Sequence, residues 1–225
     1  MTQPSAVLFD IDGTLITTGG AGGRSWAAAF RRIYDLDADI TKFSETGMTD
    51  PMVGRSVFRG VMERDPSQQE LAQLIMGYLM ELPSAVEESP GYHRMPGVIR
   101  TLEDLAAGGM LLGLVTGNIE GAARIKIDRA HLNPYFAFGG YGTDSDDRAE
   151  LTRAAISRAS TMHGTELDPA TVLVVGDTPR DVAAAHAVGA VSVAVATGEY
   201  SVERLAGAGA EHVLPTLESP FPTEI

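Results

Sequence analysis

The sequence predicts an α/β protein built on a doubly wound parallel sheet, with a block of helices inserted after the first strand. Three observations lead to this prediction. Short apolar runs alternate with longer amphipathic stretches over most of the chain. The apolar runs contain almost no polar residues, which is typical of parallel strands buried on both faces. Residues 17–92 break the alternation, because they carry only helical patterns.

Four apolar runs are predicted as buried strands and two shorter runs as weaker ones. The four are AVLFDID (6–12), MLLGLVTG (110–117), TVLVVGD (171–177) and VSVAVATG (191–198). The weaker two are FAFGGYG (136–142) and EHVLP (211–215). Helical patterns separate them near 97–107, 119–131, 148–162 and 179–187. This strand–helix–strand alternation implies helices on both faces of the sheet.

The inserted block, residues 17–92, has apolar residues at three- and four-residue steps, as between Leu71 and Leu82. TTGGAGG precedes its helices and EESPGYHRMPG follows them, so we expect two flexible crossings. The glycines are expected to act as a hinge, because a phosphate loop would also require a lysine that is missing here. The predicted division is a core of 1–16 and 93–225 and a second domain of 17–92.

Composition limits the classes of function. The hydrophobic fraction of 44% is that of a globular protein, and no apolar run approaches the ~20 residues of a membrane helix. With no basic and apolar leader at the N-terminus, we expect a cytoplasmic protein that does not bind membranes. The absence of cysteine excludes disulfides, zinc–thiolate sites and a cysteine nucleophile. Nothing in the sequence specifies an oligomeric state.

The net charge of −13 argues against non-specific nucleic-acid binding, which relies on basic residues. It also means that an anionic substrate would need a local source of positive charge. A divalent metal ion could supply it.

Two carboxylates, Asp10 and Asp12, end the first predicted strand. At positions i and i+2 they project to the same side. Ligands of open parallel sheets bind beyond the carboxyl ends of the strands, where this pair would lie. Taken alone, the pair is equally consistent with a polar Asp–Gly turn.

Other strands end on polar residues as well. Thr116, Gly117 and Asn118 offer a hydroxyl, a closely approachable backbone and a helix N-terminus, which suit an oxyanion such as phosphate. Asp177 ends another strand, and Asp181 follows about one helical turn later. Because these ends meet at one edge of the sheet, their convergence favours a binding site over a set of unrelated turns.

A cation is expected at the same edge. Arg148 is the best-placed residue, since it follows the strand at 136–142 in the first turn of a helix. Lys126 is the alternative. It lies more than two turns into the helix after Asn118, so we expect it to point away from the edge.

The segments FDIDGTL, LVTGN and VVGDTPRD, in this order and spacing, resemble the first, second and fourth motifs of the haloacid dehalogenase-like (HAD) hydrolase superfamily. The resemblance extends over nearly the whole chain. It implies a Rossmann-like core with an inserted α-helical cap domain, as in the phosphoglycolate phosphatase-like branch. The third motif of the family is commonly a lysine, and Arg148 would take its place here.

The resemblance also implies catalytic roles. Asp10 would be the nucleophile that forms an aspartyl-phosphate, and Asp12 the general acid and base. Thr116, Gly117 and Asn118 would bind the phosphate, with Arg148 as its cation. Mg²⁺ would be held by Asp10, Asp177 and the backbone carbonyl of Asp12, while Asp181 would orient a metal-bound water. In the inserted block, Thr49 and Arg55 are expected to contact the substrate.

The function expected is a Mg²⁺-dependent phosphatase acting on a small phosphorylated metabolite, with 2-phosphoglycolate as a candidate. Asp12 disfavours a dehalogenase, because a halide leaving group needs no acid. A sugar phosphomutase on the same scaffold is the alternative enzyme. A non-catalytic binding or regulatory protein is the alternative of another class.

Overall fold

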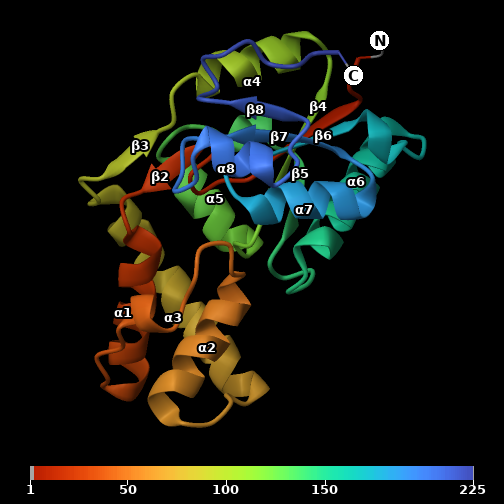
Figure 1. Ribbon diagram of the computed structural model, residues 1–225. Coiled ribbons are helices and arrows are strands. Elements are labelled where there is room, and N and C mark those ends of the chain that lie inside the picture. The colour runs from red at the N-terminus through yellow and green to blue at the C-terminus, as the bar shows by residue number, and fades with distance from the viewer. Residues whose placement is uncertain (1–2, 225) are drawn as a thin grey trace.

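The computed structural model describes residues 3–224 and contains a six-stranded parallel sheet with helices on both faces (Figure 1). The strand order is β5-β4-β1-β6-β7-β8. The strands are β1 (Ala6–Phe9), β4 (Leu111–Thr116), β5 (Phe138–Tyr141), β6 (Val172–Gly176), β7 (Val191–Val195) and β8 (His212–Leu214). All neighbouring pairs are parallel, so the predicted α/β fold is confirmed.

Alternate residues of β1 serve the two faces of the sheet. Val7 and Phe9 pack with one apolar cluster, and Ala6 and Leu8 with another. The first cluster includes residues of α4 (Val98–Ala107) and α5 (Glu120–Asp128), and the second of α6 (Arg148–His163) and α7 (Pro179–Val188). The short α8 (Val202–Gly207) was not predicted, because six residues are too few to show a helical period. Two 3₁₀ turns, Asn133–Tyr135 and Pro169–Thr171, precede β5 and β6.

Three helices of the inserted block form a further apolar cluster beside the carboxyl edge of the sheet, which Ile119 and Ala122 at the start of α5 join from the core (Figure 1). The three helices are α1 (Ala21–Tyr34), α2 (Asp50–Met62) and α3 (Gln68–Glu87), with a 3₁₀ turn at Ile40–Lys42. Trp26 of α1 stacks on Tyr78 of α3, with ring centroids 4.5 Å apart. The amphipathic periods of these segments therefore pack the helices against one another.

The connections to the inserted block differ from the prediction of two flexible crossings. β2 (Ile16–Thr18) and β3 (Tyr92–Arg94) pair as an antiparallel ribbon. Three-residue strands are too short to show alternation, which explains why the sequence pattern missed them. The helix α1 already begins at Ala21, so only Gly19 and Gly20 of the glycine run lie outside it, both with positive φ.

Within residues 3–224, no helix combines the length and the apolar character needed to cross a membrane.

Candidate active site

The edge where the parallel strands end holds the polar residues that the sequence analysis singled out. β1 ends at Phe9, and the Asp10 amide donates to the Val175 carbonyl of β6 at 2.9 Å. This bond extends the central ladder by one residue and fixes Asp10 between β4 and β6. Thr116 is the last residue of β4, and Asp177 directly follows β6.

Three carboxylates gather at this edge. Oxygens of Asp10, Asp177 and Asp181 lie within 4.8 Å of one another, and all three residues are buried. Arg148, the first residue of α6, donates from Nη2 to Asp10 Oδ2 and from Nε to Asp181 Oδ1, each at 2.6 Å. The structure therefore confirms that Arg148 reaches this edge. One guanidinium balances only part of the charge of three carboxylates.

The burial and mutual repulsion of these carboxylates raise the pKa values of two of them. Burial raises the pKa of Asp177 to about 8, and the charges of Asp10 and Asp181 add to this effect. Burial also raises the pKa of Asp10 to about 6, although Arg148 opposes the rise. Buried carboxylates whose pKa is raised in this way are favourable in their charged form only with further positive charge beside them.

The cluster fits a divalent cation. All its potential ligand atoms are oxygens, which Mg²⁺ prefers. In space, the Asp177 carboxylate is packed between two glycines that are distant from it in the sequence. A Cβ on Gly13 would lie 2.4 Å from Asp177 Oδ2, and one on Gly198 only 1.8 Å away. The Thr14 hydroxyl holds Asp177 from one side by donating to Oδ1 at 3.1 Å. Glycine at these two positions is therefore required for the Asp177 carboxylate to occupy its place beside Asp10 and Asp181.

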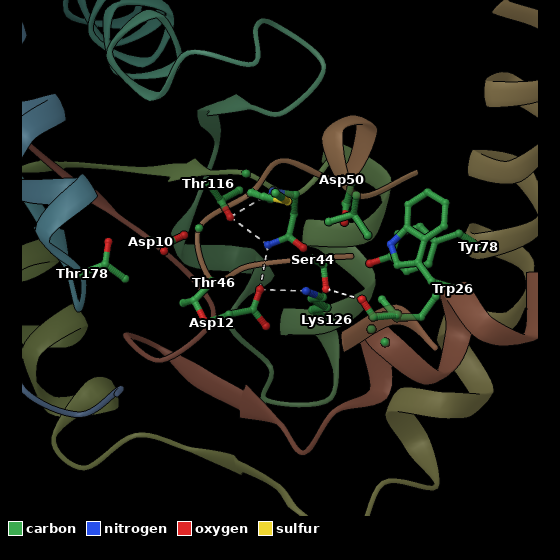
Figure 2. A pocket seen from close by; sticks show the side chains of 18 of the residues that line it. Asp10, Asp12, Trp26, Ser44, Thr46, Asp50, Tyr78, Thr116, Lys126 and Thr178 are labelled. Carbon is green, nitrogen blue, oxygen red and sulfur yellow. Dashed lines mark hydrogen bonds and ion pairs between the residues drawn. The ribbon is translucent and has the colours of Figure 1, made fainter. Parts of the chain in front are cut away.

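Lys126 corrects one prediction. The sequence analysis expected it to point away from the edge, but its Nζ donates to Asp12 Oδ2 at 2.7 Å (Figure 2). Counting helical turns gave the wrong answer because α5 runs alongside the inserted block. Ile119 and Ala122 pack into the cluster of that block, and Lys126 is 6% exposed. Burial lowers the pKa of Lys126, but Asp12 and Asp50 outweigh it, so the pKa is raised.

Asn118 joins the second strand end to Asp12. Its Nδ2 donates to Asp12 Oδ2 at 2.9 Å and to the Thr116 hydroxyl oxygen at 2.8 Å. Asp12 thus accepts hydrogen bonds from an amide and an ammonium group. Both donors fix the position of the carboxylate.

A cavity of about 200 Å³ lies between the carboxyl edge of the sheet and the inserted block (Figure 2). Asp10, Asp12 and Arg148 line it from the sheet side, as do Thr116, Gly117 and Asn118. The inserted block contributes residues from α1, from the loop before α2 and from α3. The cavity therefore joins chemistry from both parts of the chain.

The start of α2 lies directly on the loop after β4. The Asp50 amide donates to the Gly117 carbonyl at 2.8 Å, and Asp50 Oδ2 accepts from the Ile119 amide at 2.9 Å. A Cβ on Gly117 would lie 2.8 Å from the Met48 carbonyl oxygen. Glycine is thus required at this position by the close approach of the two loops.

Two residues predicted to contact the substrate lie elsewhere. Thr49 caps α2, accepting from the Met52 amide, and its hydroxyl donates to Asp146 Oδ1 at 3.1 Å. Arg55 pairs with the same Asp146. Neither lines the cavity, because both side chains are turned toward Asp146 in the loop before α6. Asp50 lines the cavity instead.

The comparisons with known proteins agree with this geometry. The family model of the haloacid dehalogenase-like hydrolases matches residues 4–189. A "Phosphoglycolate phosphatase" of Rhodospirillum rubrum is 31% identical over 217 residues, covering 92% of this chain and 86% of that protein. A "Phosphoglycolate phosphatase 1" of Pseudomonas aeruginosa is 30% identical and covers 87% of this chain and 70% of that protein.

Solved structures share the fold. A predicted phosphoglycolate phosphatase from Haemophilus somnus superposes with a TM-score of 0.73 at 19% identity, covering 96% of both chains. A β-phosphoglucomutase from Clostridium difficile superposes with a TM-score of 0.74 at 18% identity, covering 97% of this chain and 94% of that one. At these identities the likeness concerns the fold alone.

Proposed function

Because this chain belongs to the haloacid dehalogenase-like hydrolases, we propose that it is a Mg²⁺-dependent phosphatase that hydrolyses a small phosphorylated metabolite through an aspartyl-phosphate. One observation carries the proposal. Of the three clustered carboxylates, Asp10 is the one that also lines the cavity, beside Thr116 and Arg148. A carboxylate that faces both a cation site and a substrate-sized space is placed to attack phosphorus.

The cation would be held by Asp10, Asp177 and the backbone carbonyl of Asp12. When bound, Mg²⁺ would supply the positive charge that lets a carboxylate approach a phosphate dianion. Asp181 is better suited to orient a water. Its Oδ2 already accepts from the Thr178 amide and hydroxyl, and its Oδ1 from Arg148.

In the first step, an Asp10 oxygen forms a bond to phosphorus while the bond from phosphorus to the ester oxygen breaks. Asp12, in its protonated form, gives its proton to the departing oxygen. In the second step, Asp12 takes a proton from a water that attacks phosphorus, and the bond to Asp10 breaks. Thr116 and the amides after β4 bind the phosphate oxygens, and Arg148 offsets the charge that builds up on them.

The Lys126 ammonium and the Asn118 side-chain amide both donate to Asp12 and hold its carboxylate at the edge of the cavity. We assign these two side chains to positioning Asp12, which leaves the backbone amides after β4 to bind phosphate.

We propose that residues 17–92 act as a cap that opens for substrate entry and product release. The ion pairs of Arg55 with Asp146 and of Arg180 with Glu45 join this block to the core at exposed positions, where such pairs contribute only ~0–1 kcal/mol each. Opening would also have to break the buried bonds of Asp50 to Gly117 and Ile119. The β2–β3 ribbon is the covalent connection on which such a cap would turn.

A phosphate-release assay on a panel of phosphate esters, with and without Mg²⁺, tests the function. The panel includes 2-phosphoglycolate because the relatives from Rhodospirillum rubrum and Pseudomonas aeruginosa are named phosphoglycolate phosphatases. We expect Mg²⁺-dependent release by the wild type and a loss of about a thousandfold or more in Asp10→Asn, since an amide cannot form the acyl phosphate. Circular dichroism checks that the variant is folded.

Asp104→Asn, at an exposed position of α4, serves as the matched control and should retain activity. Appreciable steady-state hydrolysis by Asp10→Asn would contradict the role of Asp10. Conversion of a sugar phosphate to its isomer without phosphate release would identify a phosphomutase instead.

A further inference from the structure

The end of the cavity formed by the inserted block carries a buried hydroxyl that is poorly paired. Tyr78 of α3 is fully buried and lines the cavity, and its hydroxyl lies near the Asp50 carboxylate without a well-formed hydrogen bond to any described residue. Its ring stacks on Trp26, with an angle of 7° between the planes. Figure 2 shows this pair on the side of the cavity opposite Asp10. A buried, poorly paired hydroxyl costs stability unless a ligand binds it.

Asp50 lies beside this hydroxyl and also lines the cavity. It is 7% exposed, and its charge contributes to raising the pKa of Tyr78. Burial raises the pKa of Asp50 itself to about 6, with Lys126 opposing the rise. The inserted block therefore presents one carboxylate acceptor and one hydroxyl to whatever occupies this end.

The charges around the cavity disfavour the binding of a second anionic group of the substrate. The basic residues that line it are Lys126 and Arg148. Lys126 is bonded to Asp12, and Arg148 to Asp10 and Asp181. A substrate carboxylate at this end would thus meet Asp50 without a free cation among the described lining residues. A hydroxyl could instead donate to Asp50 and accept from Tyr78.

We propose that Asp50 and Tyr78 are specificity-determining residues that bind a free hydroxyl on the alcohol part of the substrate. The substrate class is then the monophosphate of a small polyol or sugar rather than of a hydroxy acid. This inference rests on the proposed phosphatase function. The cavity of about 200 Å³ restricts the class to small molecules.

The first test compares wild-type kcat/KM for three phosphate esters in the presence of Mg²⁺. Glycerol 1-phosphate offers free hydroxyls, 2-phosphoglycolate offers a carboxylate, and propyl phosphate offers neither. We expect glycerol 1-phosphate to exceed each of the other two by at least about tenfold, because a site built for a hydroxyl discriminates strongly against analogues without one. A preference for 2-phosphoglycolate would overturn the inference.

The second test removes one oxygen from Tyr78. Tyr78→Phe keeps the ring that stacks on Trp26, and we expect its loss in kcat/KM to be at least tenfold larger for glycerol 1-phosphate than for propyl phosphate. Tyr34→Phe is the matched control. It removes a buried hydroxyl without a partner from the same block, but Tyr34 does not line the cavity. Equal losses of Tyr78→Phe on both esters would contradict the assignment.

Asp50→Asn tests whether the negative charge of Asp50 disfavours substrates that carry a carboxylate. We expect the ratio of kcat/KM for 2-phosphoglycolate to that for glycerol 1-phosphate to rise by about tenfold, since the repelling carboxylate is gone. An unchanged ratio would count against Asp50. If no ester is hydrolysed by the wild type, the phosphatase proposal fails. If esters are hydrolysed without these preferences, only the specificity inference fails.

Discussion

At the scale of single residues, the site contains two cationic side chains that contact different carboxylates. Arg148 bonds to Asp10, the proposed nucleophile, and to Asp181, whereas Lys126 bonds to Asp12. Both are buried, so each is held close to the carboxylates that it balances. By their positions in the sequence, the two residues are alternatives for one role. The structure brings both to the cavity from different helices.

Removal of either cation should lower kcat/KM, but the two losses should depend differently on the leaving group of the substrate. Arg148→Met should lower kcat/KM by about a hundredfold on both glycerol 1-phosphate and 4-nitrophenyl phosphate, since charge on the phosphoryl group develops with either. Lys126→Met should lower it by about tenfold or more on glycerol 1-phosphate, which needs a proton from Asp12. On 4-nitrophenyl phosphate, whose leaving group needs none, its loss should be much smaller. Equal losses of Lys126→Met on the two esters would contradict its positioning of Asp12.

At the scale of elements, the β2–β3 ribbon joins the inserted block to the core. Gly19 follows β2 with φ of +57°, and a Cβ there would lie 2.7 Å from backbone atoms of Gly91. The Ser89 hydroxyl donates to the Thr18 carbonyl at 2.7 Å, and Arg24 donates to the Gly19 carbonyl at 2.7 Å. The connection is therefore tightly packed at this point rather than a loose crossing.

Gly19→Ala should destabilise the protein by about 2 kcal/mol, since alanine is unfavourable at this φ and its methyl would displace the backbone at Gly91, just before β3. Chemical denaturation measures the change in the free energy of unfolding. Gly207→Ala is the control, because Gly207 lies in α8 with nothing within 4 Å of its Cβ position. That substitution should cost nothing, since alanine favours helix more than glycine does. Similar losses in both variants would show that the approach to Gly91 is not limiting.

At the scale of the whole molecule, strands from distant parts of the sequence supply one anionic cluster. Asp10 precedes Asp177 by most of the chain length, yet the adjacent strands β1 and β6 bring their oxygens together. Packing these carboxylates opposes folding until a cation is bound. Metal binding should therefore stabilise the folded state by mass action.

Thermal unfolding with and without Mg²⁺ tests this coupling. At a Mg²⁺ concentration 100 times its Kd, the wild type should gain about 2.7 kcal/mol of stability and show a clear rise in Tm. Asp177→Asn should unfold no earlier than the wild type without metal, because it relieves repulsion, and should gain far less from Mg²⁺. Asp104→Asn should keep the full rise. A full rise in Asp177→Asn would remove Asp177 from the metal site.

The sequence by itself determined the sheet and most of the residues at its carboxyl edge. Buried parallel strands need continuous apolar runs, and ligands bind where such strands end, so Asp10, Thr116 and Asp177 followed from pattern and position. Local signals also placed the start of α6, because helix starts depend largely on neighbouring residues.

Only the tertiary structure decided which side chains meet across the cavity. The direction of α5 brings Lys126 to Asp12, and the packing of α1 on α3 turns Tyr78 toward the cavity. The docking of α2 on Gly117 places Asp50 there while it directs Thr49 and Arg55 to Asp146. Such contacts depend on how helices pack over long sequence separations, which no local spacing of residues encodes.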